Sequence, residues 1–248
     1  MTPLEAVAVF AAGVGAGGIN AVVGSGSLIT FPTLLALGYP PIVANVSNNI
    51  GMVPGGITGV MGYRPELRGQ RDRLIRLGTA SVLGSLIGGV LLLCLPEKAF
   101  QVIVPVLIGF ACVLVVAQPR LSRWLVKLRV HPHGGPWLWL GVLGAGAYGG
   151  YFGAAQGVVL IGLLGLFLDE DLQRINAAKN LLSLLVNATA AVLFTLIAQV
   201  DWSAVLMVAL GTAVGGFLGA RLGRRLPPVV LRGFIVAVGV AAIVKLVS

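Results

Sequence analysis

Two pairs of asparagines interrupt stretches of sequence that are otherwise apolar. Asn45 and Asn49 are four residues apart, and so are Asn176 and Asn180, so each pair shares one face of a helix. Amide side chains in a membrane helix are unfavourable unless they are hydrogen-bonded. We therefore expect them either to bond a neighbouring helix or to line a hydrated cavity, and their position just after a predicted turn favours the cavity.

Lys179 lies inside the second pair and has the most specific chemistry. A lysine at the centre of a membrane helix costs about 2.5–3.5 kcal/mol on insertion scales. One interpretation is that Lys179 supplies positive charge to an anionic substrate. The other is that its side chain reaches water at the nearby helix end or pairs with Asp169 or Asp171. The sequence leaves both interpretations open.

Two breaks that contain glycine precede short apolar segments. The first break is Ser25-Gly26-Ser27, before residues 28–37, and the second is Gln156-Gly157, before residues 158–168. These segments are too short to span a bilayer, because a full crossing needs about 20 helical residues. A half-helix that begins inside the bilayer exposes backbone N–H groups and the positive end of its dipole, and so can bind an anion. The alternative is that both breaks are tight turns buried by neighbouring helices.

The composition requires a lipid environment. The chain has 248 residues, of which 57% are hydrophobic and 10% charged, and its mean hydropathy is +0.99. A net charge of +9 would suggest a nucleic-acid partner in a soluble protein, but 13 of the 17 Lys and Arg residues fall in three loops, at 63–76, 119–136 and 221–232. Such clusters are typical of the cytoplasmic loops of membrane proteins. We therefore expect no nucleic-acid partner and place these loops inside the cell.

The apolar segments predict an all-α integral membrane protein. Each half has a broken or short-helix hairpin followed by three transmembrane helices. The first half has its hairpin at 4–37 and its spans at 42–62, 77–95 and 99–118, and the second has its hairpin at 137–168 and its spans at 175–198, 204–220 and 229–247.

The two halves resemble each other weakly. A shift of 131 residues aligns Gly26 with Gly157 and Asn45 with Asn176 without a gap. Each half has three full spans and a hairpin whose ends lie on the same side, so we predict inverted-topology repeats with both termini outside. Such repeats place a binding site near the midplane between them. The first repeat, the basic cytoplasmic linker and the second repeat are residues 1–118, 119–136 and 137–248.

The sequence carries no signature of an enzyme or a metal site. It has no nucleophile elbow, phosphate loop or zinc-protease helix, and no carboxylate near the centre of a predicted span. His131 and His133 lie close together, but no cluster of Cys or carboxylates accompanies them. We therefore expect no enzymatic activity, no metal and no cofactor.

The first hairpin is the most specific pattern in the chain. It reads GSGSLITFPTLLALGYPPIVANVSNNIG over residues 24–51, follows a glycine-rich helix and precedes a basic loop and a glycine-rich span, and a weak second copy comes later. This arrangement resembles the TauE/SafE sulfite exporter family. The resemblance implies a multi-pass bacterial permease that exports sulfite, sulfoacetate or related organosulfur anions. The second copy departs from the first, with Gln-Gly-Val in place of Ser-Gly-Ser and Ala-Ala-Lys-Asn in place of Val-Ser-Asn-Asn.

Together these features predict a secondary transporter of a small anion in the bacterial inner membrane. Its partners would be the anion and the lipid bilayer, while a coupling ion (H+ or Na+) and a homo-oligomer stay open. The alternatives are a passive anion channel and a carrier for an unrelated anionic metabolite. A cation transporter is disfavoured by Lys179 and by the lack of carboxylates inside the spans, and a membrane enzyme or assembly factor by the lack of a reactive cluster. The expected substrate-binding residues are Ser25, Gly26, Ser27, Asn45, Asn49, Gln156, Gly157, Asn176, Lys179 and Asn180.

Overall fold

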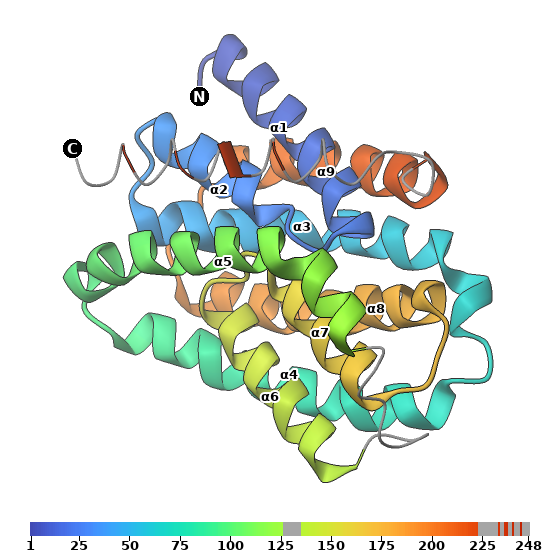
Figure 1. Cartoon of the computed structure of the whole chain (residues 1–248). Coiled ribbons are helices and arrows are strands. Elements are labelled where there is room, and N and C mark those ends of the chain that lie inside the picture. Colours follow the sequence, from blue (N-terminus) through green and yellow to red (C-terminus); the bar gives the residue numbers. More distant parts are fainter. Residues whose placement is uncertain (126–134, 223–232, 234–235, 238–239, 241–243, 245–248) are drawn as a thin grey trace.

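The computed structural model describes residues 1–125, 135–222, 233, 236, 237, 240 and 244, and its regular structure over these residues is helical (Figure 1). The predicted all-α fold is thereby confirmed. The predicted span 229–247 and residues 126–134 of the linker, with His131 and His133, fall almost entirely outside the described residues. The helices are α1 (Pro3–Val22), α2 (Ser27–Ala36), α3 (Pro41–Gly62), the 3₁₀ helix η1 (Arg64–Leu67), α4 (Arg71–Cys94), α5 (Glu97–Leu125), α6 (Pro136–Tyr151), α7 (Gln156–Phe167), α8 (Leu172–Ile197) and α9 (Trp202–Leu222).

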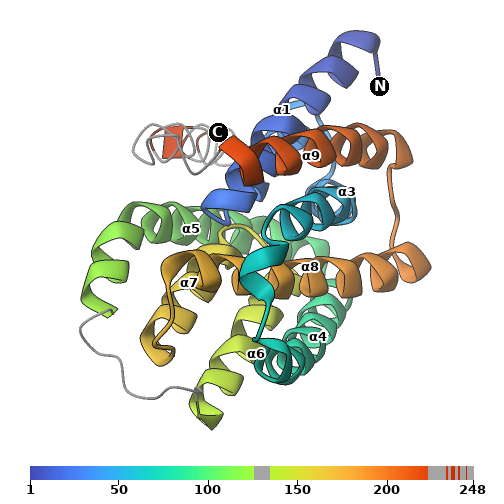
Figure 2. The same ribbon diagram turned by 90° about the vertical axis from the view of Figure 1, so that its right-hand side faces the viewer.

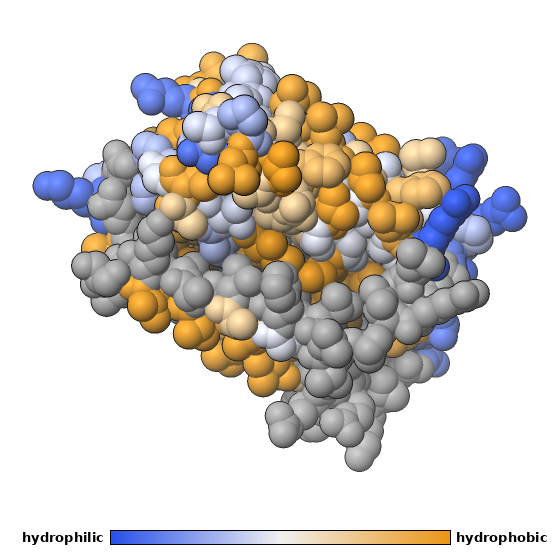
Figure 3. Space-filling model, turned by 90° about the horizontal axis from the view of Figure 1, so that it is seen from above, coloured by the Kyte–Doolittle hydropathy of each residue, from blue (hydrophilic) through white to orange (hydrophobic). Residues whose placement is uncertain are grey.

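Within the described part, five helices are long and apolar enough to cross a membrane. They lie in α1, α4, α5, α8 and α9. Helices α2 and α7 have only 10 and 12 residues, as expected of half-helices. Helix α3 has 22 residues but is not among these five, and it carries three asparagines and several glycines. Apolar side chains cover much of the face shown in Figure 3. The chain is a multi-pass membrane protein.

Two helix boundaries differ from those predicted. Helix α4 begins at Arg71, inside the predicted loop 63–76, and η1 occupies another part of that loop. Helix α5 runs on to Leu125, beyond its predicted end at 118. Both extensions are rich in Arg and Leu, which are good helix formers, so the helices continue past their apolar runs.

The helices are arranged in layers. Helices α1 and α9 pack side by side on one side of the molecule, α4 and α6 pack together on the opposite side, and α3 and α8 lie between them (Figures 1 and 2). Small residues allow both outer pairs to approach closely. A Cβ atom at Gly13 of α1 would lie 3.1 Å from Cα of Gly211, and one at Gly146 of α6 would lie 2.8 Å from the carbonyl oxygen of Ser81.

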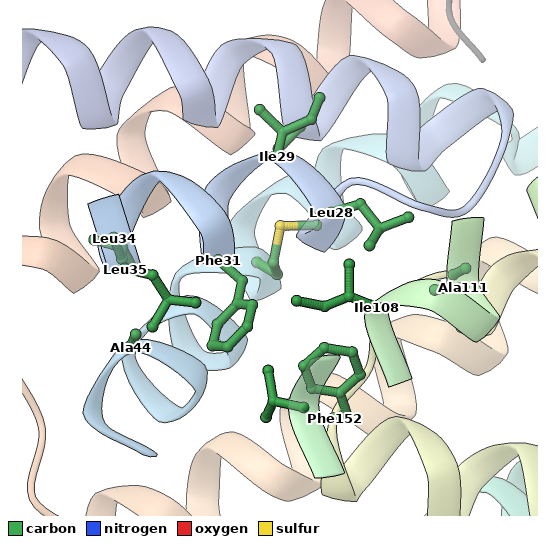
Figure 4. Close-up of a cluster of buried hydrophobic side chains, with 14 of the residues drawn as sticks. Leu28, Ile29, Phe31, Leu34, Leu35, Ala44, Ile108, Ala111 and Phe152 are labelled. Atoms are coloured by element: carbon green, nitrogen blue, oxygen red, sulfur yellow. The ribbon is translucent and has the colours of Figure 1, made fainter. Parts of the chain in front are cut away.

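An apolar core fixes α2 against the second helix break. Figure 4 shows Phe31 of α2 beside Ile108 of α5 and Phe152, the residue that follows α6. The rings of Phe31 and Phe152 meet edge to face with their centroids 5.3 Å apart. The half-helix of the first hairpin is therefore packed directly onto the break of the second.

Candidate functional site

Both breaks turn through a glycine in the left-handed backbone region. Helix α1 is followed by Gly24 at φ +85°, and α6 is followed by Gly153 at φ +80°. This conformation favours glycine because a side chain would be strained there. Helices α2 and α7 then begin without a hydrogen bond from a capping side chain. Backbone carbonyls take the place of a side-chain cap at several of the first N–H groups, including that of Gln156, which donates to the carbonyl of Gly153 at 3.4 Å.

The two breaks, far apart in the sequence, meet in the fold. The backbone N–H of Gly157 donates to the carbonyl of Gly24 at 3.0 Å. A Cβ atom at Gly24 would lie 2.7 Å from the carbonyl carbon of Gly157, so only glycine allows this approach. The turn glycines, Gly24 and Gly153, are two residues out of the 131-residue register, because α7 is two residues longer than α2 and begins earlier. The ungapped alignment is therefore wrong at the breaks.

The asparagines hold the broken helix ends of the opposite half. The side-chain amide of Asn45, on α3, donates to the carbonyl of Tyr151 at the end of α6 (3.0 Å). Asn176 and Asn180, on α8, donate to the carbonyl of Ala21 near the end of α1 (3.2 and 3.1 Å). Such carbonyls lack partners within their own helix, so these amides cap them.

Lys179 points into the same region. Its Nζ donates to the carbonyls of Asn20 (2.8 Å) and Ala21 (3.3 Å), and the residue is 0% exposed. The predicted alternative, in which Lys179 reaches water or pairs with Asp169 or Asp171, is therefore wrong. Within the described part of the chain, no carboxylate forms an ion pair with it. The amino group of Lys179 is thus buried beside the crossing of the two breaks.

Several buried polar atoms near the crossing have no hydrogen-bond partner among the described residues. They belong to residues that the sequence singled out, with Ser183 as an addition that it missed. Ser183 lies one helical turn after Lys179, and this i, i+4 spacing is the signal that could have identified it. Buried polar atoms without a partner in the protein are available to bond a water, an ion or a ligand. The atoms are Ser25 Oγ, Asn45 Oδ1, Asn49 Oδ1, Gln156 Nε2, Asn176 Oδ1 and Ser183 Oγ.

A charged cluster joins the ends of α4 and α8. Glu170 accepts from Arg73 of α4 at 2.9 Å and from Arg174 of α8 at 2.6 Å. Partial burial opposes ionisation of Glu170, but the hydrogen bonds from Arg174 and Arg73 outweigh it and lower the pKa of its carboxyl below the ordinary 4.5. This cluster lies on the predicted cytoplasmic side and ties together the first turns of two helices.

A groove of about 810 Å³ lies between α4 and α8, away from the crossing. Its lining is apolar except for Arg71 and Thr79, and it contains none of the expected substrate-binding residues. Those residues are instead concentrated at the two breaks and on the asparagine-bearing faces of α3 and α8.

Comparison with known proteins identifies a family of membrane transporters. The family described as "Sulfite exporter TauE/SafE" matches residues 9–246. The chain is 27% identical to the "Probable membrane transporter protein YfcA" of Escherichia coli K12 over 227 residues, which cover 91% of this chain and 82% of that protein. It is 28% identical to a "Probable membrane transporter protein" of Haemophilus influenzae, with 91% and 90% of the two chains covered.

A further relative from Sinorhizobium sp, "Probable membrane transporter protein ORF9", is 22% identical over 94% of this chain and 88% of its own. No solved structure matches the chain. The family match extends over nearly all of the chain, and the alignments cover 82% and 90% of the first two relatives. Both relatives are named as probable membrane transporters. This multi-pass membrane protein therefore belongs to the TauE/SafE sulfite exporter family.

Proposed function

We propose that this transporter moves a small anion, which binds where the two helix breaks meet. The observation that carries the proposal is the buried amino group of Lys179 beside the crossing, bonded to carbonyls and to no carboxylate of the described residues. An uncompensated positive charge in a low-dielectric interior is unfavourable, and an anion beside it would supply the compensation.

The anion would be held by N–H and O–H donors around the crossing. The start of α2 would supply the backbone N–H of Ser27, and the dipoles of α2 and α7 would place their positive ends beside the anion. The unpartnered Gln156 Nε2 and Ser25 Oγ would donate to oxygens of the anion. Gly26 and Gly157 would also line the site, with the space that a side chain would take filled by the backbone of Ala16 at Gly26 and of Gly24 at Gly157.

The asparagines would act on the anion during the transport cycle. In this conformation the amide nitrogens of Asn45, Asn176 and Asn180 donate to the ends of α6 and α1. Direct bonds from these nitrogens to the anion therefore belong to another conformation, in which the helix ends move away from α3 and α8. Asn49 completes the set on α3.

The substrate would be sulfite or a related sulfur oxyanion or organosulfonate, moved outward. The family description, sulfite exporter, supports this class. A trigonal or tetrahedral oxyanion has several acceptor oxygens, which fits a site built from two half-helix starts and an ammonium. The protein would act as a carrier and not as an enzyme.

Alternating access would come from one half rocking against the other. We propose that residues 1–118 and 137–248 are inverted repeats, with both termini outside. The packing of the helices supports this. The 131-residue shift relates α1 to α6, α3 to α8 and α4 to α9. It therefore relates the packed pair α1–α9 to the packed pair α6–α4, and the packed pair α3–α9 to the packed pair α8–α4. In such repeats the site lies between the two halves.

A passive anion channel is the second candidate, because two half-helices that meet inside a membrane protein can also form a selective pore. Flux into proteoliposomes separates the two. We would compare sulfite, sulfoacetate, thiosulfate and sulfate for the wild type, for Lys179→Met and for Lys98→Met, which removes an exposed lysine of α5. We expect saturable flux of one sulfur anion that Lys179→Met abolishes and Lys98→Met preserves. Flux that does not saturate would favour the channel, and no flux of any of the four would overturn the proposed substrate class.

A further inference from the structure

The groove of about 810 Å³ between α4 and α8 takes no part in the proposed transport site. Most of its wall comes from α4, from Arg71 at the start of the helix to Leu83. Helix α8 contributes Leu181 and Leu185. Figure 2 shows the two helices side by side. The groove therefore follows the seam between α4 and α8.

The length of this groove matches one leaflet of a bilayer. The candidate span of α4 begins at Arg71, and Leu83 lies near its middle. Between these two residues the helix rises about 18 Å, whereas half of a hydrocarbon core is about 15 Å thick. Leu185 likewise lies near the middle of α8. The groove thus extends from the start of the spans to about the level of the bilayer midplane.

The inner part of the groove is apolar. Apart from Arg71, the polar residue of the lining is Thr79. Its hydroxyl donates to the carbonyl of Arg76 at 2.7 Å and accepts from the indole N–H of Trp139 at 3.3 Å, so it is already hydrogen-bonded. A hydrated anion would lose its water there without new partners, whereas a hydrocarbon chain suits the surface.

The outer end of the groove carries a positive charge. Arg71 is exposed, and within the described part of the chain no carboxylate forms an ion pair with it. Arg73 differs, because it is paired with Glu170. The surrounding segment, residues 63–76, contains five arginines and two acids, so this end of the molecule is basic. A guanidinium binds a phosphate through two parallel hydrogen bonds.

We propose that the groove binds an anionic phospholipid, with an acyl chain along α4 and α8 and the phosphate on Arg71. The charge of Arg71 complements the head group, and the apolar length from Arg71 to Leu83 matches the depth that a chain occupies in one leaflet. Basic pockets between transmembrane helices are a known binding site for acidic head groups. A zwitterionic lipid would gain less, because its own cation already compensates its phosphate.

The bound lipid would contact both halves of the protein. Helix α4 belongs to residues 1–118 and α8 to residues 137–248. A lipid that packs on both helices would stabilise the arrangement of the halves seen here, and its release would shift the balance toward other conformations. This consequence rests on the proposed function, whereas binding of the lipid itself does not.

The test measures lipid binding without any sulfur anion. Purified protein in a non-ionic detergent is titrated with phosphatidylglycerol, with phosphatidylcholine of the same acyl chains, or with inorganic phosphate. Native mass spectrometry counts the bound lipids and the protein copies, and melting temperatures are measured in parallel.

Two variants and two matched controls separate the head group from the chain. Arg71→Gln removes the charge, and Arg64→Gln removes an exposed arginine outside the groove. Leu83→Trp fills the inner end of the groove, and Leu86→Trp makes the same change at an exposed leucine of α4 outside it. Leu83 is 47% exposed, so a larger side chain should not disturb the core.

We expect the wild type, Arg64→Gln and Leu86→Trp to bind phosphatidylglycerol about tenfold or more tightly than phosphatidylcholine, with a raised melting temperature. Arg71→Gln should lose this preference, and Leu83→Trp should weaken binding of both lipids. Equal affinity of the wild type for the two lipids, or a preference that Arg71→Gln retains, would overturn the inference. So would stabilisation by inorganic phosphate equal to that by phosphatidylglycerol, or a lipid-free dimer that Leu83→Trp dissociates and Leu86→Trp does not.

Discussion

Replacing Gly157 by alanine tests whether the two breaks touch. A Cβ atom there would lie 2.9 Å from the carbonyl oxygen of Gly24 and 2.9 Å from Cδ of Lys179, and against Cα of Gly24. Two of these three neighbours are backbone atoms that cannot turn aside, so the overlap falls in the class of overpacking that costs about 1–3 kcal/mol. Gly157 does not have a positive φ, so the predicted loss is steric and involves no backbone strain.

Gly165→Ala is the matched control on the same helix. A Cβ atom at Gly165 would meet nothing within 4 Å. Alanine is a better helix former than glycine by about 1 kcal/mol, so Gly165→Ala should be neutral or stabilising. The same gain in helix propensity applies to Gly157→Ala, where it opposes the destabilisation caused by the steric overlap. The difference between the two variants should therefore be about 1–3 kcal/mol, with Gly157→Ala the less stable.

Melting temperatures of the two purified variants in the same detergent provide the assay. We expect Gly157→Ala to melt below the wild type and Gly165→Ala at or above it. Anion flux should also fall in Gly157→Ala, because the start of α7 is displaced from the crossing. Equal melting temperatures for the two variants would refute the contact between the breaks.

Three further predictions concern the helix ends, the charged cluster and the orientation. Asn45→Ala should lower stability by about 1–3 kcal/mol more than Asn176→Ala in the same melting assay. The reason is that the carbonyl bonded by Asn176 also accepts from two other side chains, whereas Asn45 alone bonds the carbonyl of Tyr151. Equal effects of the two substitutions would contradict the capping roles. Glu170→Gln should cost about 0.5–1 kcal/mol at pH 7. Because the folded pKa of Glu170 is lowered, this advantage of the wild type should decline below pH 4.5 and vanish under the folded pKa, and melting from pH 7 to acid checks it. Single cysteines at Arg68 and Lys98 should react with an impermeant reagent from the inside and the outside of the cell respectively, and the reverse pattern would invert the proposed topology.

The helices and the breaks could be predicted because their causes are local. Runs of apolar residues determine the long helices. The first break falls at Gly24 to Ser27, where glycine permits the turn that ends the helix. The spacing of the asparagines placed them on one face without further information. The positions of these elements along the chain therefore followed from composition and period alone.

The partners of the polar side chains could not be predicted in the same way. Lys179 and Asn176 bond backbone carbonyls, and a carbonyl has the same chemistry at every residue, so no sequence pattern marks it. Which helices pack together was equally hidden, because small-residue faces on α1, α4, α6 and α9 are similar to one another. The two-residue shift at the second break was missed because a short gap in a weak repeat leaves little trace in the sequence.

Equilibrium binding of ³⁵S-labelled sulfite to the purified protein tests the central claim most directly. Lys179→Met removes the charge with little change in volume and relieves the burial of an unpaired cation, so the variant should stay folded. We predict saturable binding to the wild type and to Lys98→Met, and binding weaker by about tenfold or more for Lys179→Met. Equal sulfite affinity in Lys179→Met and the wild type would contradict an anion site at the crossing of the two breaks.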